Sequence, residues 1–252
     1  MKTIFYDVDT QNDFMNKDYA LYVPDAELIK PNLAQLTKYA CEKGTPIFGS
    51  VDRHFGTEEY KHREGELQRN GGPFPNHCMD GTDGQLKIKE TRYLCEDFTE
   101  HILQACFVEN SFQKTFFKLH HGFFESVLLT DATLKTSILD LIEKYTKKEF
   151  GRAEIYTTPG IFFEKQHYDV ATNPWFEKVM QAVAPQKAIV YGVATDYCVK
   201  AGAIALRKVG IQEVYVVTDT IKGITQEGSQ KALEEMANEG IKFSTIKEII
   251  KS

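Results

Sequence analysis

Lys187-Ala188-Ile189-Val190-Tyr191-Gly192-Val193-Ala194-Thr195-Asp196-Tyr197-Cys198-Val199 is the stretch that decides the fold of this 252-residue chain. Its first half is a short apolar run, which predicts a buried strand. Beyond it, apolar residues recur at helical spacing as far as Gly210, and they predict a helix over Asp196–Val209. Cys198 therefore lies where a strand passes into a helix, close to the N-terminus of that helix.

This position gives Cys198 two possible roles. Free backbone N–H groups and the positive end of the helix dipole gather at a helix N-terminus, and both favour a thiolate, the reactive form of cysteine. The same N–H groups could stabilise an oxyanion. The alternative role is a small buried residue that packs under the helix. The other strand ends of the chain decide between the two.

The same alternation of strand and helix runs along most of the chain. Strands are expected over Ile4–Val8, Pro46–Val51, Ile161–Glu164, Ala188–Gly192, Val214–Thr218 and Lys242–Thr245. Helices are expected over Asp25–Glu42, Asn173–Val183, Asp196–Val209 and Gln226–Asn238. This order predicts an α/β fold, with a parallel sheet covered by helices on both faces and its chemistry at the carboxyl ends of the strands.

Composition limits the classes of partner. The net charge of −6 and the lack of a basic run argue against nucleic acid and anionic membranes. No apolar stretch reaches the roughly 20 residues of a membrane span, and the N-terminus turns acidic too early for a signal peptide. Five cysteines without a CxxC pair indicate reduced thiols in a cytoplasmic protein. We expect one domain over 1–252, with an elaboration at about 82–158 that contains a helix over Lys135–Tyr145.

Acidic residues follow the first strand. Asp9 stands at its carboxyl end, where a catalytic carboxylate would belong, although aspartate is also common in turns. Asp7 alternates with Asp9 along the strand and could face the same side. If both side chains are buried together, at least one should have a raised pKa.

A possible metal site follows the second strand. Asp52 and His54 end that strand, and His77 comes from a later loop, so the three could form a set of ligands with open positions. Imidazole with carboxylate suits Zn²⁺, Fe²⁺ or Mn²⁺. An Asp-x-His pair alone more often marks a surface loop. His62 is a possible additional ligand.

A lysine directly follows the third strand. Lys165 would be drawn to the same rim as Asp9 and Cys198, where its charge could lower the pKa of the thiol. Lys114 also follows apolar residues and is the alternative. The 33 residues from Lys165 to Cys198 suffice for one helix and one strand, whereas Lys114 would place the whole elaboration between the two catalytic strands. Lys165 is therefore preferred.

Taken together, these segments resemble the isochorismatase-like cysteine hydrolase superfamily, and within it the nicotinamidase-type amidases. Five segments carry the resemblance, in order: Asp9-Thr10-Gln11-Asn12-Asp13-Phe14, Asp52-x-His54, His77-Cys78-Met79-Asp80-Gly81-Thr82, Glu164-Lys165-x-x-Tyr168-Asp169 and Gly192–Val199. The first and last are the most specific. The long elaboration and the Ala171-Thr172-Asn173-Pro174 segment depart from the family pattern, and they leave the substrate open.

The resemblance implies a three-layer α/β/α sandwich on a mostly parallel six-stranded sheet. It implies a catalytic triad of Asp9, Lys165 and Cys198, and a cis peptide between Val193 and Ala194. The backbone N–H groups of Ala194 and Cys198 would then form the oxyanion hole. A divalent metal, with Zn²⁺ preferred to Fe²⁺ or Mn²⁺, would bind Asp52, His54 and His77. We also expect Phe14 and Phe74 to stack on a flat substrate ring.

The implied activity is hydrolysis of a small amide through a thioester, with nicotinamide and a role in NAD metabolism as the first expectation. The same family includes hydrolases of other small amides and of carbamoyl or ureido compounds. Two further alternatives are an inactive binding domain and a hydrolase that uses only the metal site. The family also implies a homo-oligomer.

Overall fold

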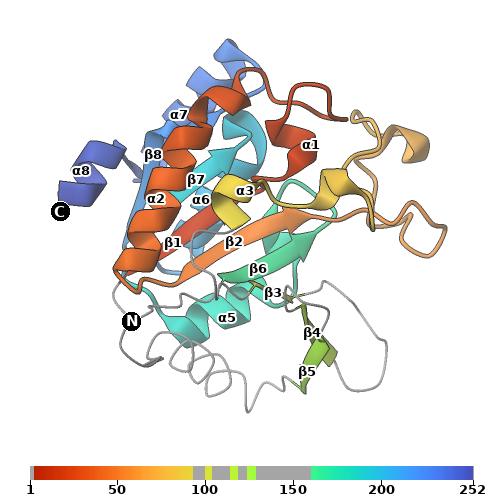
Figure 1. Cartoon of the computed structure of the whole chain (residues 1–252), viewed down its shortest axis with the longest axis horizontal. Helices are drawn as coiled ribbons and strands as arrows, with labels where there is room; N and C mark the ends of the chain where they lie inside the picture. The colour runs from red at the N-terminus through yellow and green to blue at the C-terminus, as the bar shows by residue number, and fades with distance from the viewer. Residues whose placement is uncertain (1–2, 93–99, 104–113, 119–123, 129–159, 252) are drawn as a thin grey trace.

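Figure 1 shows a computed structural model of the chain, which describes residues 3–92, 100–103, 114–118, 124–128 and 160–251. The helix expected over Lys135–Tyr145 and most of the elaboration lie outside the described residues. Within the described part, no helix is long and apolar enough to cross a bilayer.

The main sheet is parallel throughout, which confirms the predicted fold class. Its strand order is β3-β6-β2-β1-β7-β8-β9. The strands are β3 (Glu100–Leu103), β6 (Gly160–Lys165), β2 (Ile47–Asp52), β1 (Thr3–Val8), β7 (Lys187–Val193), β8 (Glu213–Lys222) and β9 (Lys242–Ser244). Six of them match the expected strands, and β3 adds a seventh at the edge. A separate antiparallel pair is formed by β4 (Lys114–Lys118) and β5 (Phe124–Leu128).

Helices cover both faces of this sheet, so the fold has the three expected layers (Figure 1). One core contains side chains of α2 (Lys30–Glu42) and α8 (Ile246–Lys251). The opposite core contains side chains of α5 (Phe176–Val183), α6 (Lys200–Lys208) and α7 (Gln226–Asn238). The central strands β1, β2 and β7 are buried along nearly their whole length because both of their faces are covered. Short helices α1 (Asn12–Met15) and α3 (Lys89–Arg92) lie between strands.

Two expected helices begin differently from the sequence pattern. A 3₁₀ turn, Ala26–Ile29, precedes α2, and a π turn, Thr195–Val199, precedes α6. The apolar spacing predicts which face of a helix is buried, but it does not distinguish the hydrogen-bond pattern of the first turn. Cys198 lies in the π turn.

The register of the strands brings four chain segments to one edge. Asp52 pairs with Lys165 across β2 and β6, and Val8 at the end of β1 pairs with Gly192 in β7. Gly192 has φ +121°, and a Cβ there would lie 2.0 Å from the Val8 carbonyl oxygen. Only glycine therefore allows β1 and β7 to approach this closely just before the Cys198 segment.

Candidate active site

Three side chains from three strand ends meet at this edge of the sheet. Lys165 Nζ lies 2.7 Å from Asp9 Oδ2 and donates a hydrogen bond to Cys198 Sγ at 3.5 Å. Asp9 and Lys165 are buried, whereas Cys198 is half-buried and faces a pocket. The structure therefore brings together the three residues predicted as a triad. Lys114 instead begins β4, in the separate two-stranded pair.

The turn after β1 fixes Asp9. Its φ of 49° lies in the left-handed region, which is uncommon for a residue other than glycine and is concentrated at functional sites. The Gln11 N–H donates to the Asp9 carbonyl at 2.7 Å, and the Ser50 hydroxyl donates to Asp9 Oδ1 at 2.7 Å. Asp9 is thus both a turn residue and a carboxylate directed at Lys165.

Burial and charge together set the protonation of the triad. Burial raises the pKa of Asp9, and the nearby Asp52 adds to this, while Lys165 and a hydrogen bond from Cys198 act against it. Burial alone would lower the pKa of Lys165, but Asp52 and Asp9 raise it well above its usual range, so this side chain is a cation. Burial also raises the pKa of Asp7, which confirms the prediction made for the Asp7 and Asp9 pair.

The resting form of Cys198 differs from the expected thiolate. Removal from water raises the pKa of the thiol well above its ordinary value, and the carboxylates of Asp9 and Asp52 add to this. Lys165 opposes these effects without reversing them. The thiolate was predicted from the strand–helix position of Cys198 alone. That prediction did not include the two carboxylates that other strands bring close to the thiol. A neutral thiol needs a base, and Asp9 is in position to be one.

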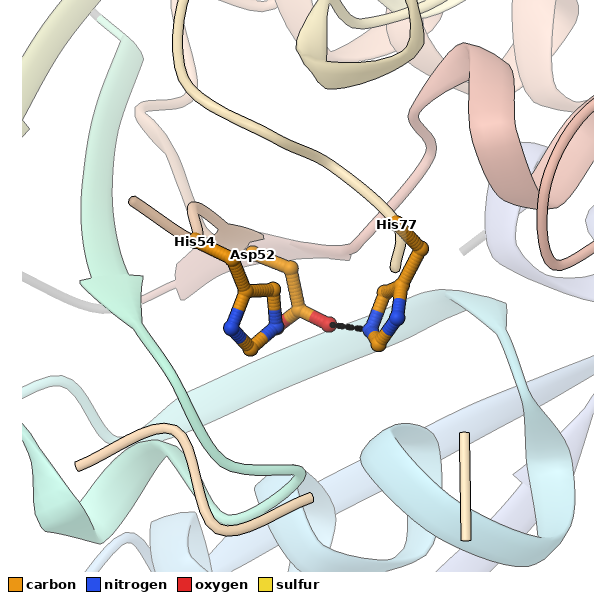
Figure 2. A group of neighbouring side chains, drawn as sticks. All are labelled: Asp52, His54 and His77. Carbon is orange, nitrogen blue, oxygen red and sulfur yellow. Dashed lines mark ion pairs between the residues drawn. The ribbon is translucent and has the colours of Figure 1, made fainter. Parts of the chain in front are cut away.

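Asp52, His54 and His77 form the only group in the described residues with the donor geometry of a metal site, and one ligand atom from each lies within 4.8 Å of the others (Figure 2). Asp52 Oδ2 is 3.5 Å from His77 Nε2, and Lys165 donates a hydrogen bond to Asp52 Oδ1. His77 Nδ1 faces the Pro75 carbonyl oxygen at 2.7 Å, which orients the ring and leaves Nε2 toward Asp52. His62 is exposed and lies outside this group.

The surroundings of His54 indicate that Asp52, His54 and His77 are suited to bind a cation. Neither of its ring nitrogens has a hydrogen-bond partner among the described residues, although the side chain is buried. Buried polar atoms without a partner are costly, and a bound cation would satisfy one of them. Burial lowers the pKa of His54 to about 4, so its imidazole is neutral, as a metal ligand must be.

Charges around the group hold Asp52 ionised. Burial would raise the pKa of its carboxyl, but Lys165 and the two histidines hold it well below its usual range. Burial would lower the pKa of His77, yet its hydrogen bond and charge interaction with Asp52 raise it instead. The donor set is therefore one carboxylate and two imidazoles, which suits Zn²⁺, Fe²⁺ or Mn²⁺.

A mainly apolar pocket opens onto both groups of residues. It is lined by Phe14, Leu21, Val23, Asp52, Glu66, Phe74, His77, Tyr168, Val193, Ala194, Tyr197, Cys198 and Ile224. Both phenylalanines predicted to bind a ring are among these residues. The ring centroids of Phe14 and Phe74 lie 5.5 and 6.2 Å from that of His77. The pocket therefore offers apolar and aromatic walls between the thiol and the possible metal ligands.

The backbone beside the pocket agrees with the expected oxyanion hole. The Val193–Ala194 peptide is cis, as the resemblance implied. Ala194 and Cys198 both line the pocket, one directly after β7 and the other within the π turn. The Val199 N–H donates to the Ala194 carbonyl at 3.1 Å, which closes the turn around Cys198.

Sequence reasoning missed several residues of the site. Tyr168 and Tyr197 lie within the quoted motifs, so their closeness in sequence to Lys165 and Cys198 could have indicated that they line the site. Ser50 lies two residues before Asp52 in β2, and no sequence pattern marks it because its neighbours are mainly apolar. Glu66 lies in a loop between Asp52 and His77, and no periodicity or motif marks it.

Residues 145–248 match the model of the isochorismatase domain. No curated protein matches the chain. Among solved structures, the chain is similar to a pyrazinamidase of Pyrococcus horikoshii in complex with zinc, with 24% identity and a TM-score of 0.62 over 98% of this chain and 100% of that one.

Two further structures are similar over nearly the same length. A nicotinamidase/pyrazinamidase from Bacillus subtilis shows 18% identity and a TM-score of 0.62, over 97% of this chain and 100% of that one. An isochorismatase-like hydrolase from Alkaliphilus metalliredigens shows 15% identity and a TM-score of 0.59, over 100% of this chain and 98% of that one. The match to the isochorismatase domain agrees with the isochorismatase-like resemblance drawn from the motifs, and the similar structures confirm the fold.

Proposed function

We propose that this chain is an amide hydrolase of the nicotinamidase type, which releases ammonia from a small amide through a thioester on Cys198. The observation that carries the proposal is the position of Lys165, which contacts both Asp9 and Cys198, and Cys198 lines a pocket. The similarity to nicotinamidases and pyrazinamidases supports the choice of substrate, nicotinamide, while hydrolysis of another small amide or of a carbamoyl or ureido compound is the alternative.

The proposed reaction uses Asp9 twice. Asp9 takes the proton of the thiol as sulfur attacks the carbonyl carbon, and the oxyanion is held at the N–H groups of Ala194 and Cys198. Protonated Asp9 then gives this proton to the departing nitrogen, so that ammonia leaves and a thioester remains. Asp9 next accepts a proton from water as the water oxygen attacks the thioester carbonyl. It then returns this proton to the departing sulfur, which releases the acid and restores the thiol. Lys165 stays cationic and stabilises the charges that pass between Asp9 and sulfur.

Asp52, His54 and His77 would hold a divalent cation beside the pocket. When bound, such a cation would supply a Lewis acid for a ring nitrogen or a water molecule. Phe14 and Phe74 would orient a flat ring against it, because aromatic side chains pack on ring faces and edges. The similar zinc-containing pyrazinamidase supports zinc as the metal.

Turnover of nicotinamide, pyrazinamide and several carbamoyl and ureido compounds, measured as ammonia release, tests this proposal. Cys198→Ala should reduce kcat on the best substrate by about 10⁴-fold or more because the nucleophile is lost, while circular dichroism and Tm stay close to those of the native protein. Cys41→Ala, which removes a buried cysteine from the α2 core, is the control and should retain turnover. Substantial turnover by Cys198→Ala would reject the mechanism.

The wider setting is part of the proposal. We infer a single catalytic domain over 1–252, with the elaboration at about 82–158 attached to it. We also propose that the protein acts in the cytoplasm as a homo-oligomer, without nucleic acid or membrane as partner. Light scattering on the purified protein tests the oligomer, and a monomer at micromolar concentration would reject it.

A further inference from the structure

Glu66 is the one charged side chain among the described pocket residues that neither the triad nor the metal group uses. It is only 9% exposed, although it belongs to a loop and comes from outside every motif of the sequence. Burying a carboxylate is expensive unless its oxygens find partners. The contacts of Glu66 therefore indicate which of its carboxylate oxygens could accept a hydrogen bond from a ligand.

One oxygen of Glu66 is already engaged. Oε1 accepts a hydrogen bond from the Tyr168 N–H at 3.2 Å and lies 3.5 Å from His167 Nε2. The Asp169 N–H donates to His167 Nδ1 at 3.2 Å, which leaves Nε2 as the protonated nitrogen that faces Glu66. These contacts fix Glu66 against the segment that follows β6. No contact of this kind is made by Oε2 with the other described residues.

The rest of the pocket wall offers a ligand few other polar side chains. Beyond Asp52 and His77, which belong to the possible metal site, the other polar groups are the thiol of Cys198 and the hydroxyls of Tyr168 and Tyr197, so Glu66 is the one further charged side chain. The rest of the wall is apolar: Phe14, Leu21, Val23, Phe74, Val193, Ala194 and Ile224. A substrate held between these apolar side chains would meet the carboxylate of Glu66 as an acceptor. A negatively charged substituent there would face a like charge at short range.

We propose that Glu66 determines substrate specificity, by accepting a hydrogen bond from an N–H or O–H group that the substrate carries away from its reacting amide. The substrate class is then a small flat amide that bears an amino or hydroxyl substituent. This inference rests on the proposed function, because it names the substrate of the same pocket. A site with a buried acceptor discriminates strongly against analogues that leave this acceptor unpaired.

Matched pairs of ring amides test the inference. The probes are nicotinamides with an amino group at ring position 5 or 6, each paired with the methyl compound of nearly equal size. The metal-loaded native enzyme should show a kcat/KM ratio, amino over methyl, of about tenfold or more for at least one pair, since hydrogen bonds to charged groups discriminate by at least this much. Glu66→Leu should bring that ratio close to one, and Glu66→Gln should reduce it.

Two controls separate fold and function from specificity. Glu59→Leu changes an exposed glutamate of the same loop and should leave the ratio unchanged. Equilibrium binding of the same pairs to Cys198→Ala gives a second readout that needs no turnover and should show the same preference. A ratio near one in the native enzyme, or a ratio that Glu66→Leu does not alter, overturns the inference. Absence of hydrolysis with the binding preference intact supports the inference and rejects the proposed function instead.

Discussion

At the scale of single residues, Lys165 organises the site. Its ammonium group contacts the carboxylates of Asp9 and Asp52 and the sulfur of Cys198. Lys165 and both carboxylates are buried, and Cys198 is half-buried. Two carboxylates share one buried cation, so the pair cannot be neutralised in full. Burial raises the pKa of Asp9, and the neighbouring Asp52 adds to this, whereas Lys165 and two histidines lower the pKa of Asp52 against the effect of its burial.

The raised pKa of Asp9 predicts the acid side of the pH profile. Asp9 must be ionised to take the thiol proton, so kcat/KM should fall as the pH drops through its pKa in the free enzyme. The midpoint should lie above the ordinary value for aspartate, which is about 3.9. Ser50→Ala removes a hydrogen bond to the ionised form and should move the midpoint upward by about half a unit to one unit.

Ser229→Ala, which removes a hydroxyl from the exposed face of α7, is the control and should leave this midpoint in place. Stopped-flow or coupled measurement of kcat/KM across the acid range provides the values. An acid midpoint at or below the ordinary aspartate value, or a downward shift in Ser50→Ala, would contradict the role given to Asp9.

Much of the triad could be predicted at this scale. Asp9 and Lys165 directly follow apolar strands, and parallel strands carry their carboxyl ends to one edge, so their meeting follows from the sequence pattern. The protonation of Cys198 could not be predicted, because it depends on how far the thiol is removed from water. The position of the Glu66 side chain depends on its hydrogen bond with the Tyr168 N–H, and no local sequence pattern predicts such a contact.

At the scale of elements, the approach of β1 and β7 determines where the π turn begins. Gly192 lies opposite Val8, and its positive φ leads directly into Val193 and Ala194. The register of β7 with β8 shifts between Val190 and Gly192, so the end of β7 departs from regular pairing. Ala194 and Cys198, which follow this departure in the chain, line the pocket.

Gly192→Ala should therefore destabilise the protein strongly. The added Cβ meets the Val8 backbone at 2.0 Å and also disfavours the observed φ. We expect a loss of about 3 kcal/mol or more in the free energy of unfolding, from steric overlap and backbone strain together. Gly210→Ala is the matched control, because Gly210 has φ +99° but nothing lies within 4 Å of its Cβ position.

The control isolates the steric part of the effect. Gly210→Ala should cost only about 1–2 kcal/mol, from the unfavourable φ alone. Urea unfolding of both variants, analysed with a common slope, gives the comparison. Equal losses for the two variants would show that the close approach of β1 and β7 does not constrain the fold.

The periodicity of apolar residues predicted which helices and strands form better than it predicted where each one ends. The expected helix Gln226–Asn238 agrees with α7 at both ends, and Thr225 caps its N-terminus by accepting a hydrogen bond from the Gly228 N–H. The expected strand Val214–Thr218 is shorter than β8, which continues to Lys222. The added residues include polar Asp219 and Thr220, which fall where the pairing with β7 is irregular, and the strand resumes its pairing with β7 at Ile221 and Lys222. Tertiary pairing rather than apolar pattern therefore extends the strand to Lys222.

At the scale of the whole molecule, the possible metal site joins separate parts of the chain. Asp52 ends the central strand β2 and His54 lies two residues beyond it, whereas His77 comes from a loop (Figure 2). Arg53 links the same parts from the other side, through ion pairs with Asp80 and with Glu164 of β6. A cation bound by these ligands would add a further connection and would stabilise the folded state by mass action.

Metal binding should accordingly raise Tm. At a free Zn²⁺ concentration about 100 times its Kd, the expected stabilisation is about 2.7 kcal/mol, or roughly 5–10 °C for a chain of this size. His54→Ala should abolish this increase, whereas His62→Ala, which changes an exposed histidine outside the ligand group, should retain it. Differential scanning calorimetry with chelated and zinc-loaded protein measures the effect, and an equal increase in His54→Ala would reject the site.

The overall architecture was the most predictable feature of the chain. Alternating strands and helices imply a parallel sheet with two helical layers, and the structure has this arrangement. The seventh strand, β3, was not predicted because it comes from the elaboration, where apolar alternation is weak. The pocket could be only partly predicted, since Leu21, Val23 and Ile224 reach it from loops whose paths depend on the finished fold.

The central claim is that Cys198 carries the acyl group of the substrate. The most direct measurement is rapid acid quenching of the metal-loaded enzyme during turnover of its best amide substrate, followed by mass spectrometry of the peptide that contains Cys198. We predict that this peptide gains the mass of one acyl group within the first turnover, and that Cys198→Ala gains none. Turnover at the full rate with the Cys198 peptide unmodified at every time point would contradict the account.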